Sequence, residues 1–129
     1  MEGADVGFDW HRDEDLGVLR MVLQDEFADD ESSRAAAADL ADAGGWTGDL
    51  VLVDLRRVDV TSVPHYVEFQ RRVDLWLARW GMPRRIAILA GTGPRVGIAH
   101  MLKGASRDVA GRVEVFDDEY EALAGLVGG

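Results

Sequence analysis

The residues whose types could do chemistry are most concentrated in a short stretch that holds Asp59, Ser62 and His65. A hydroxyl, an imidazole and a carboxylate are the groups that acyl-transfer enzymes use as nucleophile, general base and orienting group. Closeness along the chain does not by itself create a hydrogen-bonded relay, and none of the serines lies in a Gly-x-Ser-x-Gly turn. A hydrolase-type enzyme using acyl or phosphoryl chemistry is therefore kept as an alternative, and no catalytic residue is assigned.

A second stretch with chemical potential is the glycine-rich segment AGTGPRVG, residues 90–97. A dinucleotide fingerprint requires a third glycine where Val96 stands, and a P-loop requires a lysine followed by serine or threonine. The backbone amides near Thr92 and Arg95 lie at a predicted helix N-terminus, where a weak anion site is physically possible. A plain turn between a strand and a helix is the simpler interpretation, and the sequence predicts no cofactor.

The histidines give no metal-binding pattern, because His11, His65 and His100 are far apart and form no HExxH-type pair. The segment DWHRDED, residues 9–15, mixes one imidazole with several carboxylates and could hold a hard cation. The tip of a solvated hairpin explains this composition with fewer assumptions. We therefore predict no metal site.

The elements that must position these residues follow the order ββαβαβαβα, which predicts an α/β fold with a mostly parallel sheet and an N-terminal antiparallel hairpin. Residues 6–23 are typical of the hairpin, and residues 49–55 and 84–90 are apolar runs typical of strands covered on both faces. Helices are predicted for residues 27–44, from Pro64 to Trp80, from Arg95 to Ala110 and from about Asp118, with a last strand at residues 112–116.

The four tryptophans differ in how firmly the pattern places them. Trp76 and Trp80 lie on the helix stripe that should face the sheet, which predicts core positions. Trp10 and Trp46 are less constrained, and either could border a pocket or a partner surface. A homodimer through Trp10 or a sheet edge therefore stays possible.

Length and composition limit the classes of protein that the chain can belong to. The 129 residues, 47% of them hydrophobic, predict a single domain spanning residues 1–129. The formal net charge of -10 argues against a nucleic-acid partner, because a phosphate backbone would be repelled. The chain has no cysteine, no N-terminal basic and apolar targeting pattern and no apolar run long enough for a membrane span, so we expect a cytoplasmic location.

Four segments carry a family resemblance, in this order: LVLVDLRRVDV, RRIAILAG, GIAHMLKGAS and VEVFDDEYEAL. Together they resemble the SpoIIAA-like family of small bacterial proteins, which shares its fold with STAS domains and with CRAL-TRIO lipid-binding domains. In an anti-sigma-factor antagonist of this kind, the strand resembling VLVDL leads to a helix start that bears a phosphorylatable serine. Counted from Asp54, that place falls at about Pro64, and the nearby hydroxyls of Thr61 and Ser62 stand earlier in the chain. We interpret Ser62 as a helix cap or turn residue.

The functional prediction is a small, non-enzymatic SpoIIAA-like domain, regulatory in character, that binds a protein partner or a small apolar or anionic ligand. Ligands of open α/β sheets bind beyond the carboxyl ends of the parallel strands, where the connector 59–65 and the loop 91–97 should lie. The predicted binding residues are Thr61, Ser62, His65, Thr92 and Arg95. A carrier of lipid or another hydrophobic ligand is the first alternative to this function.

Overall fold

A mixed five-stranded sheet forms the centre of the molecule, in a computed structural model that describes residues 8–25, 31–58, 66–104 and 107–128. The strands follow one another across the sheet in chain order: β1 (Phe8–Asp13), β2 (Val18–Asp25), β3 (Leu50–Val58), β4 (Arg85–Leu89) and β5 (Val113–Phe116). β1 pairs antiparallel with β2, and the later neighbours pair parallel. The prediction of an α/β fold that opens with an antiparallel hairpin is confirmed.

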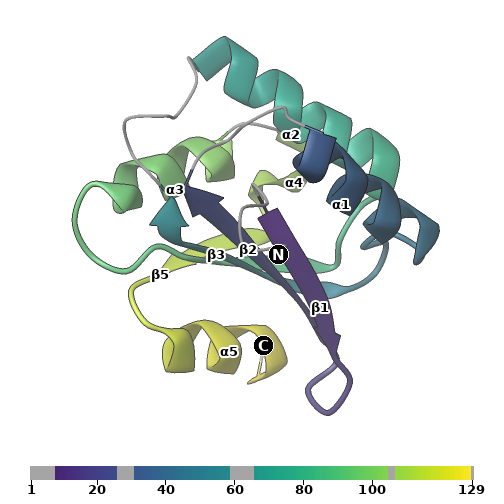
Figure 1. The fold of residues 1–129 in the computed structure, drawn as a ribbon. Coiled ribbons are helices and arrows are strands. Elements are labelled where there is room, and N and C mark those ends of the chain that lie inside the picture. Colours follow the sequence, from purple (N-terminus) through teal and green to yellow (C-terminus); the bar gives the residue numbers. More distant parts are fainter. Residues whose placement is uncertain (1–7, 26–30, 59–65, 105–106, 129) are drawn as a thin grey trace.

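The helices lie on both faces of this sheet, but unequally (Figure 1). One face carries α1 (Glu31–Asp42), α2 (Tyr66–Trp80), α3 (Arg95–Gly104) and α4 (Arg107–Ala110). The other face carries α5 (Glu119–Gly128), which packs against β3, β4 and β5. None of the helices in the described ranges has the length and apolar character needed to cross a membrane.

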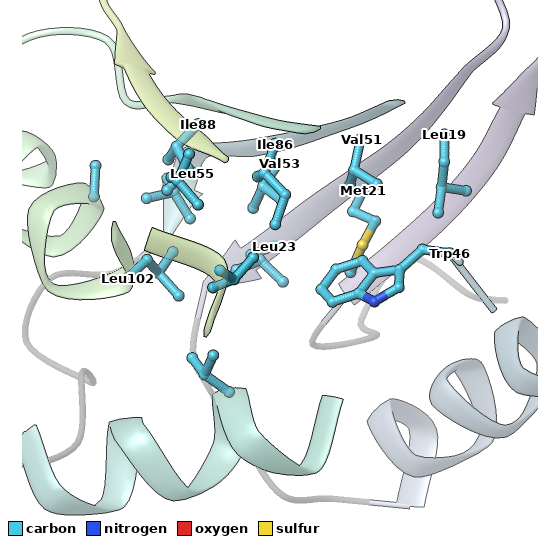
Figure 2. Close-up of a cluster of buried hydrophobic side chains, with 14 of the residues drawn as sticks. Leu19, Met21, Leu23, Trp46, Val51, Val53, Leu55, Ile86, Ile88 and Leu102 are labelled. Atoms are coloured by element: carbon cyan, nitrogen blue, oxygen red, sulfur yellow. The ribbon is translucent and has the colours of Figure 1, made fainter. Parts of the chain in front are cut away.

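The central strand β3 is apolar along most of its length because both of its faces are covered. Val51, Val53 and Leu55 point into the larger core beneath α1 to α4, whereas Leu52 points into the smaller core beneath α5. The larger core is shown in Figure 2, and its labelled side chains are Leu19, Met21, Leu23, Trp46, Val51, Val53, Leu55, Ile86, Ile88 and Leu102.

Two tryptophans fix the helix layer to the loop before β3. Trp80 is buried, and its indole N–H donates to the carbonyl of Ala37 in α1 at 3.1 Å. Its ring meets that of Trp46 edge to face, with centroids 4.9 Å apart, and stacks on Trp76 at 5.8 Å. Trp80 is therefore a core residue, as predicted, and Trp46 is buried there as well rather than placed on a partner surface.

A glycine makes this tryptophan packing possible. Gly45 has a φ of 66°, and a Cβ added there would lie 2.5 Å from the carbonyl oxygen of Trp80. A side chain at this position would therefore collide with backbone, and the backbone conformation is one that L-residues rarely adopt. The close approach lets the amide of Trp46 donate to the same Trp80 carbonyl at 3.0 Å.

The helices after β4 and after β5 can be compared with the sequence. The helix predicted from Arg95 to Ala110 is described as α3, which ends at Gly104, and α4, which begins at Arg107, and residues 105–106 between them lie outside the described residues. At the start of α5 the carboxylate of Asp118 accepts a hydrogen bond from the amide of Glu121 at 2.9 Å, which caps the helix that the sequence predicted from about Asp118.

Candidate functional site

Thr92 lies in the loop that joins β4 to α3, and Arg95 is the first residue of α3, at the edge of the sheet where the parallel strands end. Thr92 is exposed and Arg95 is half-buried. The Nε of Arg95 donates to the carbonyl of Val58, the last residue of β3, at 2.9 Å. This bond fixes the loop after β4 beside the end of β3. We call this surface, residues 91–97 together with Val58, the rim.

The other predicted site residues, Thr61, Ser62 and His65, lie outside the described residues, as does Asp59. The compact trio of Asp59, Ser62 and His65 is thus still a sequence-based hypothesis. Their segment begins immediately after Val58 in the chain. The bond from Arg95 to Val58 therefore brings the loop 91–97 to the point where that segment starts.

The glycine-rich loop forms tight turns between β4 and α3. Gly91 and Gly93 have φ values of 71° and 89°, and the amide of Val96 donates to the carbonyl of Gly93 at 3.2 Å. This geometry is that of a compact connection from a strand to a helix, as the sequence predicted. A Cβ at Gly91 would lie 3.5 Å from Cγ of Arg56. The loop therefore lies against the side chain of Arg56, which belongs to a group of charged residues.

That group consists of Arg20, Asp54, Arg56 and Glu119, and we call it the Arg56 cluster. One Nη of Arg56 lies 2.9 Å from a carboxylate oxygen of Asp54 and 3.1 Å from one of Glu119. The guanidinium of Arg20 lies 2.8 Å from the same Glu119 oxygen. The cluster therefore joins β2, β3 and the start of α5 through alternating charges.

Asp54 is only 7% exposed, yet its carboxylate is well supplied with donors. The backbone amide of Arg56 donates to it at 2.9 Å and the Nε of Arg56 at 3.1 Å, and the Nη bond completes a two-pronged contact. The hydrogen bond with Asp54 is the main reason that the pKa of Arg56 is raised above its ordinary value. Both groups are therefore held in place by each other, with Glu119 as an outer partner.

Sequence reasoning did not identify the Arg56 cluster as a unit. It used Asp54 only as a landmark for counting along the chain. A signal was present, because a carboxylate inside an apolar strand and an arginine two residues later share one face of the sheet. The contribution of Glu119 had no local signal, since it is 63 residues from Arg56.

Two open grooves lie on either side of this cluster, where α5 leaves the first strands uncovered. One has a volume of ≈ 420 Å³ and is lined by Asp9, Val22, Asp54, Arg56 and Arg57. The other, which we call the hairpin groove, has a volume of ≈ 400 Å³ and is lined by His11, Asp13, Leu16, Val18, Arg20, Glu119 and Leu123. The face of the sheet beside α5 is thus hollowed and charged.

The face of the sheet covered by α1 to α4 holds an apolar cavity of a different kind. It has a volume of ≈ 30 Å³ and lies among core side chains that include Trp46, Val53 and Leu102. A cavity of this size has room for about one water molecule, whereas pockets that hold drug-sized ligands measure roughly 300 to 1,000 Å³. Trp46 does border a cavity, but one too small for a lipid.

Comparison with known proteins adds no relative: no family model, no curated protein and no solved structure matches the chain. The resemblance to the SpoIIAA-like family therefore rests on the four sequence segments and is used below only as support for a proposal.

Proposed function

We propose that the chain is a non-enzymatic, regulatory binding module of the SpoIIAA-like type, and that a protein partner docks at the rim. The observation that carries the proposal is the hydrogen bond from Arg95 to the carbonyl of Val58. It holds an exposed loop against the end of the neighbouring parallel strand, at the edge of the sheet where α/β proteins bind their ligands.

The state of the charged groups near this edge supports binding rather than chemistry. The guanidinium of Arg95 is engaged by a backbone carbonyl, and that of Arg56 is engaged by Asp54 and Glu119. Such contacts fix the shape and charge of a surface. A general base or nucleophile needs instead a group placed to react with a substrate, and the described residues supply no such pairing at the rim.

The choice of a protein partner over a hydrophobic ligand follows from the small volume of the apolar cavity. A lipid carrier needs an apolar cavity about ten or more times larger than the ≈ 30 Å³ found between the sheet and its helix layer. A small anion at the rim would meet a chain whose formal net charge is -10. A partner that spreads its contacts over the loops of the rim faces neither difficulty.

A photocrosslinking amino acid placed at position 92 tests the proposal directly. Thr92 is exposed in the rim, and Arg84, exposed before the opposite end of β4, gives the matched control position. We expect one protein to be captured from cells through position 92 and not through position 84. With that partner purified, Arg95→Ala should weaken binding about tenfold, as for a residue that shapes a contact surface, while Arg84→Ala leaves it unchanged.

Two results would contradict the proposal. Equal capture through both positions would mean that the crosslinks report random encounters. A purified partner whose affinity is the same for the unmodified protein and for the Arg95→Ala and Thr92→Ala variants would place its binding site elsewhere.

A further inference from the structure

The last helix has exposed apolar side chains as well as buried ones. Ala122 and Leu126 are buried against the sheet, as expected of an inward face. The outward face carries Tyr120, which is 84% exposed, and Val127, which is 50% exposed. A helix on a protein surface usually has a polar outer face. Exposed apolar side chains such as Tyr120 and Val127 are therefore unusual on α5 and are typical of a contact surface.

The hairpin that joins β1 to β2 extends this apolar surface. Leu16, in the turn, is 43% exposed and lines the hairpin groove together with Leu123 of α5. Val18, at the start of β2, forms part of the same lining and is buried. In Figure 1 the hairpin turn extends beyond the end of β1, and α5 lies on one face of the sheet. The groove therefore has an apolar wall on each side.

Acidic residues lie in the groove and in the hairpin turn. Asp13 and Glu119 are part of the groove lining, and the exposed Glu14 and Asp15 follow Asp13 in the turn between β1 and β2. The one arginine in the lining, Arg20, is already 2.8 Å from Glu119. The field over the groove is therefore negative, in agreement with the formal net charge of -10.

We propose that the hairpin groove docks a basic amphipathic helix of a partner protein. Apolar side chains of that helix pack on Leu16, Leu123 and Tyr120, and its lysine or arginine side chains face Asp13, Glu14 and Asp15 of the hairpin. The charge of the surface selects this occupant, because opposite charges steer the encounter and like charges oppose it. A second copy of the chain would bring two acidic surfaces together, which would repel each other. Its helix α5 has no lysine or arginine that could pair with the acidic residues.

This inference goes beyond the rim, because the hairpin groove and the rim have no residue in common. Changes at Thr92 and Arg95 test the rim, and changes at Leu16 and Tyr120 test the groove. Failure at one surface therefore leaves the other to be judged on its own results.

The probe is a synthetic peptide of about 14 residues, roughly 21 Å long as a helix, with leucines on one face and lysines on the other. Two controls accompany it: a peptide of the same composition in scrambled order, and one with glutamate in place of lysine. Binding is measured by fluorescence anisotropy, and the contact surface by changes in amide and methyl NMR signals of the unmodified protein. We expect shifts at Leu16, Tyr120, Leu123 and Val127, and binding about tenfold weaker for the scrambled peptide.

Variants of exposed residues then locate the contact. Tyr120→Glu and Leu16→Glu should each weaken binding of the lysine peptide about tenfold, because each places a buried charge in the apolar contact. Leu75→Glu is the matched control, since Leu75 is a 47% exposed leucine on α2, on the other side of the sheet. The affinity of the Leu75→Glu variant for the lysine peptide should equal that of the unmodified protein. Thermal unfolding confirms that each variant is folded.

Several outcomes would overturn the inference. Equal binding of the lysine and scrambled peptides, or an equal loss in the Leu75→Glu variant, would mean attraction to an acidic protein without a specific groove. Signal changes confined to residues 91–97 would assign the peptide to the rim. A sedimentation mass that falls from dimer to monomer in the Tyr120→Glu variant would show that a second copy occupies this surface.

Discussion

The two faces of the sheet differ in what covers them and in how completely they are covered. One face lies beneath α1 to α4 and is apolar, with Trp80 and Trp46 locked together at its margin. The other is covered by α5 only across β3 to β5, and carries a buried carboxylate, ion pairs and two open grooves. The comparison indicates that the first face holds the larger apolar core and supplies most of the stability, and that the second presents charged and open surfaces.

The largest loss of stability is expected from Trp80→Ala, on the face covered by α1 to α4. The change removes a buried ring, its contacts with two other tryptophans and the indole bond to Ala37. We expect the free energy of unfolding to fall by about 3 to 5 kcal/mol, measured by urea denaturation. A loss below about 1 kcal/mol, which is the level of an ordinary surface change, would contradict the assignment of this face as the main core.

The next effect is expected from Gly45→Ala, which tests the close approach of the loop to Trp80. The new methyl group meets the Trp80 backbone at 2.5 Å in a conformation unfavourable for alanine. We expect a loss of about 2 kcal/mol or more in the free energy of unfolding. Gly48→Ala is the matched control, because Gly48 has a similar φ of 74° and no atom within 4 Å of an added Cβ. Equal losses in the two variants would leave backbone strain as the whole cause.

On the α5 face, Arg56→Met is expected to have a smaller effect. It leaves Asp54 buried without its side-chain partner, and we expect a loss of about 1 to 2 kcal/mol, limited by the exposure of Arg56. The double variant Asp54→Asn/Arg56→Met should be more stable than Arg56→Met alone, because the unpaired charge is gone. If the double variant is the less stable of the two, Asp54 does not depend on Arg56.

The raised pKa of Arg56 determines how this contribution varies with pH. A group whose pKa is higher in the folded state stabilises the protein below its unfolded pKa, and the stabilisation is lost as the pH rises through the folded pKa. The pKa of Arg56 is raised mainly by its hydrogen bond with Asp54. The contribution of the Arg56 charge is therefore expected to be constant from neutral to mildly alkaline pH and to decrease only in strong alkali.

The smallest effect is expected on the outward side of α5. Tyr120→Ser changes a side chain that is 84% exposed, and the free energy of unfolding should change by no more than about 0.5 kcal/mol. Thermal unfolding of the isolated protein measures it. A loss comparable with that of Trp80→Ala would mean that Tyr120 supports the fold rather than an external contact.

The fold could be predicted well from the sequence because its signals are local. The apolar run of β3 and β4, the charged turn of the hairpin and the capping residue Asp118 each specify an element within a few neighbouring residues. The apolar stripe that predicted a helix from Arg95 to Ala110 has Leu102 in α3 and Val109 in α4, both of them buried. Periodicity indicates which face is buried but does not locate a helix end.

The candidate surfaces were less predictable because they depend on residues far apart in the chain. Thr92 and Arg95 were chosen from the rule for parallel strand ends, and the bond to Val58 gives the reason why their loop is held there. The pairing of Arg56 with Glu119, and the groove that Leu16 and Leu123 line together, follow only from the packing of α5. A propensity or a motif cannot supply such long-range contacts.

Hydrogen exchange with and without the partner captured through position 92 tests the central claim most directly. The account predicts slower amide exchange in residues 91–97, with exchange in α1 and α2 unchanged. Slower exchange confined to α1 and α2 would mean that the helix-covered side makes the contact, and would contradict the assignment of recognition to the rim and the α5 side.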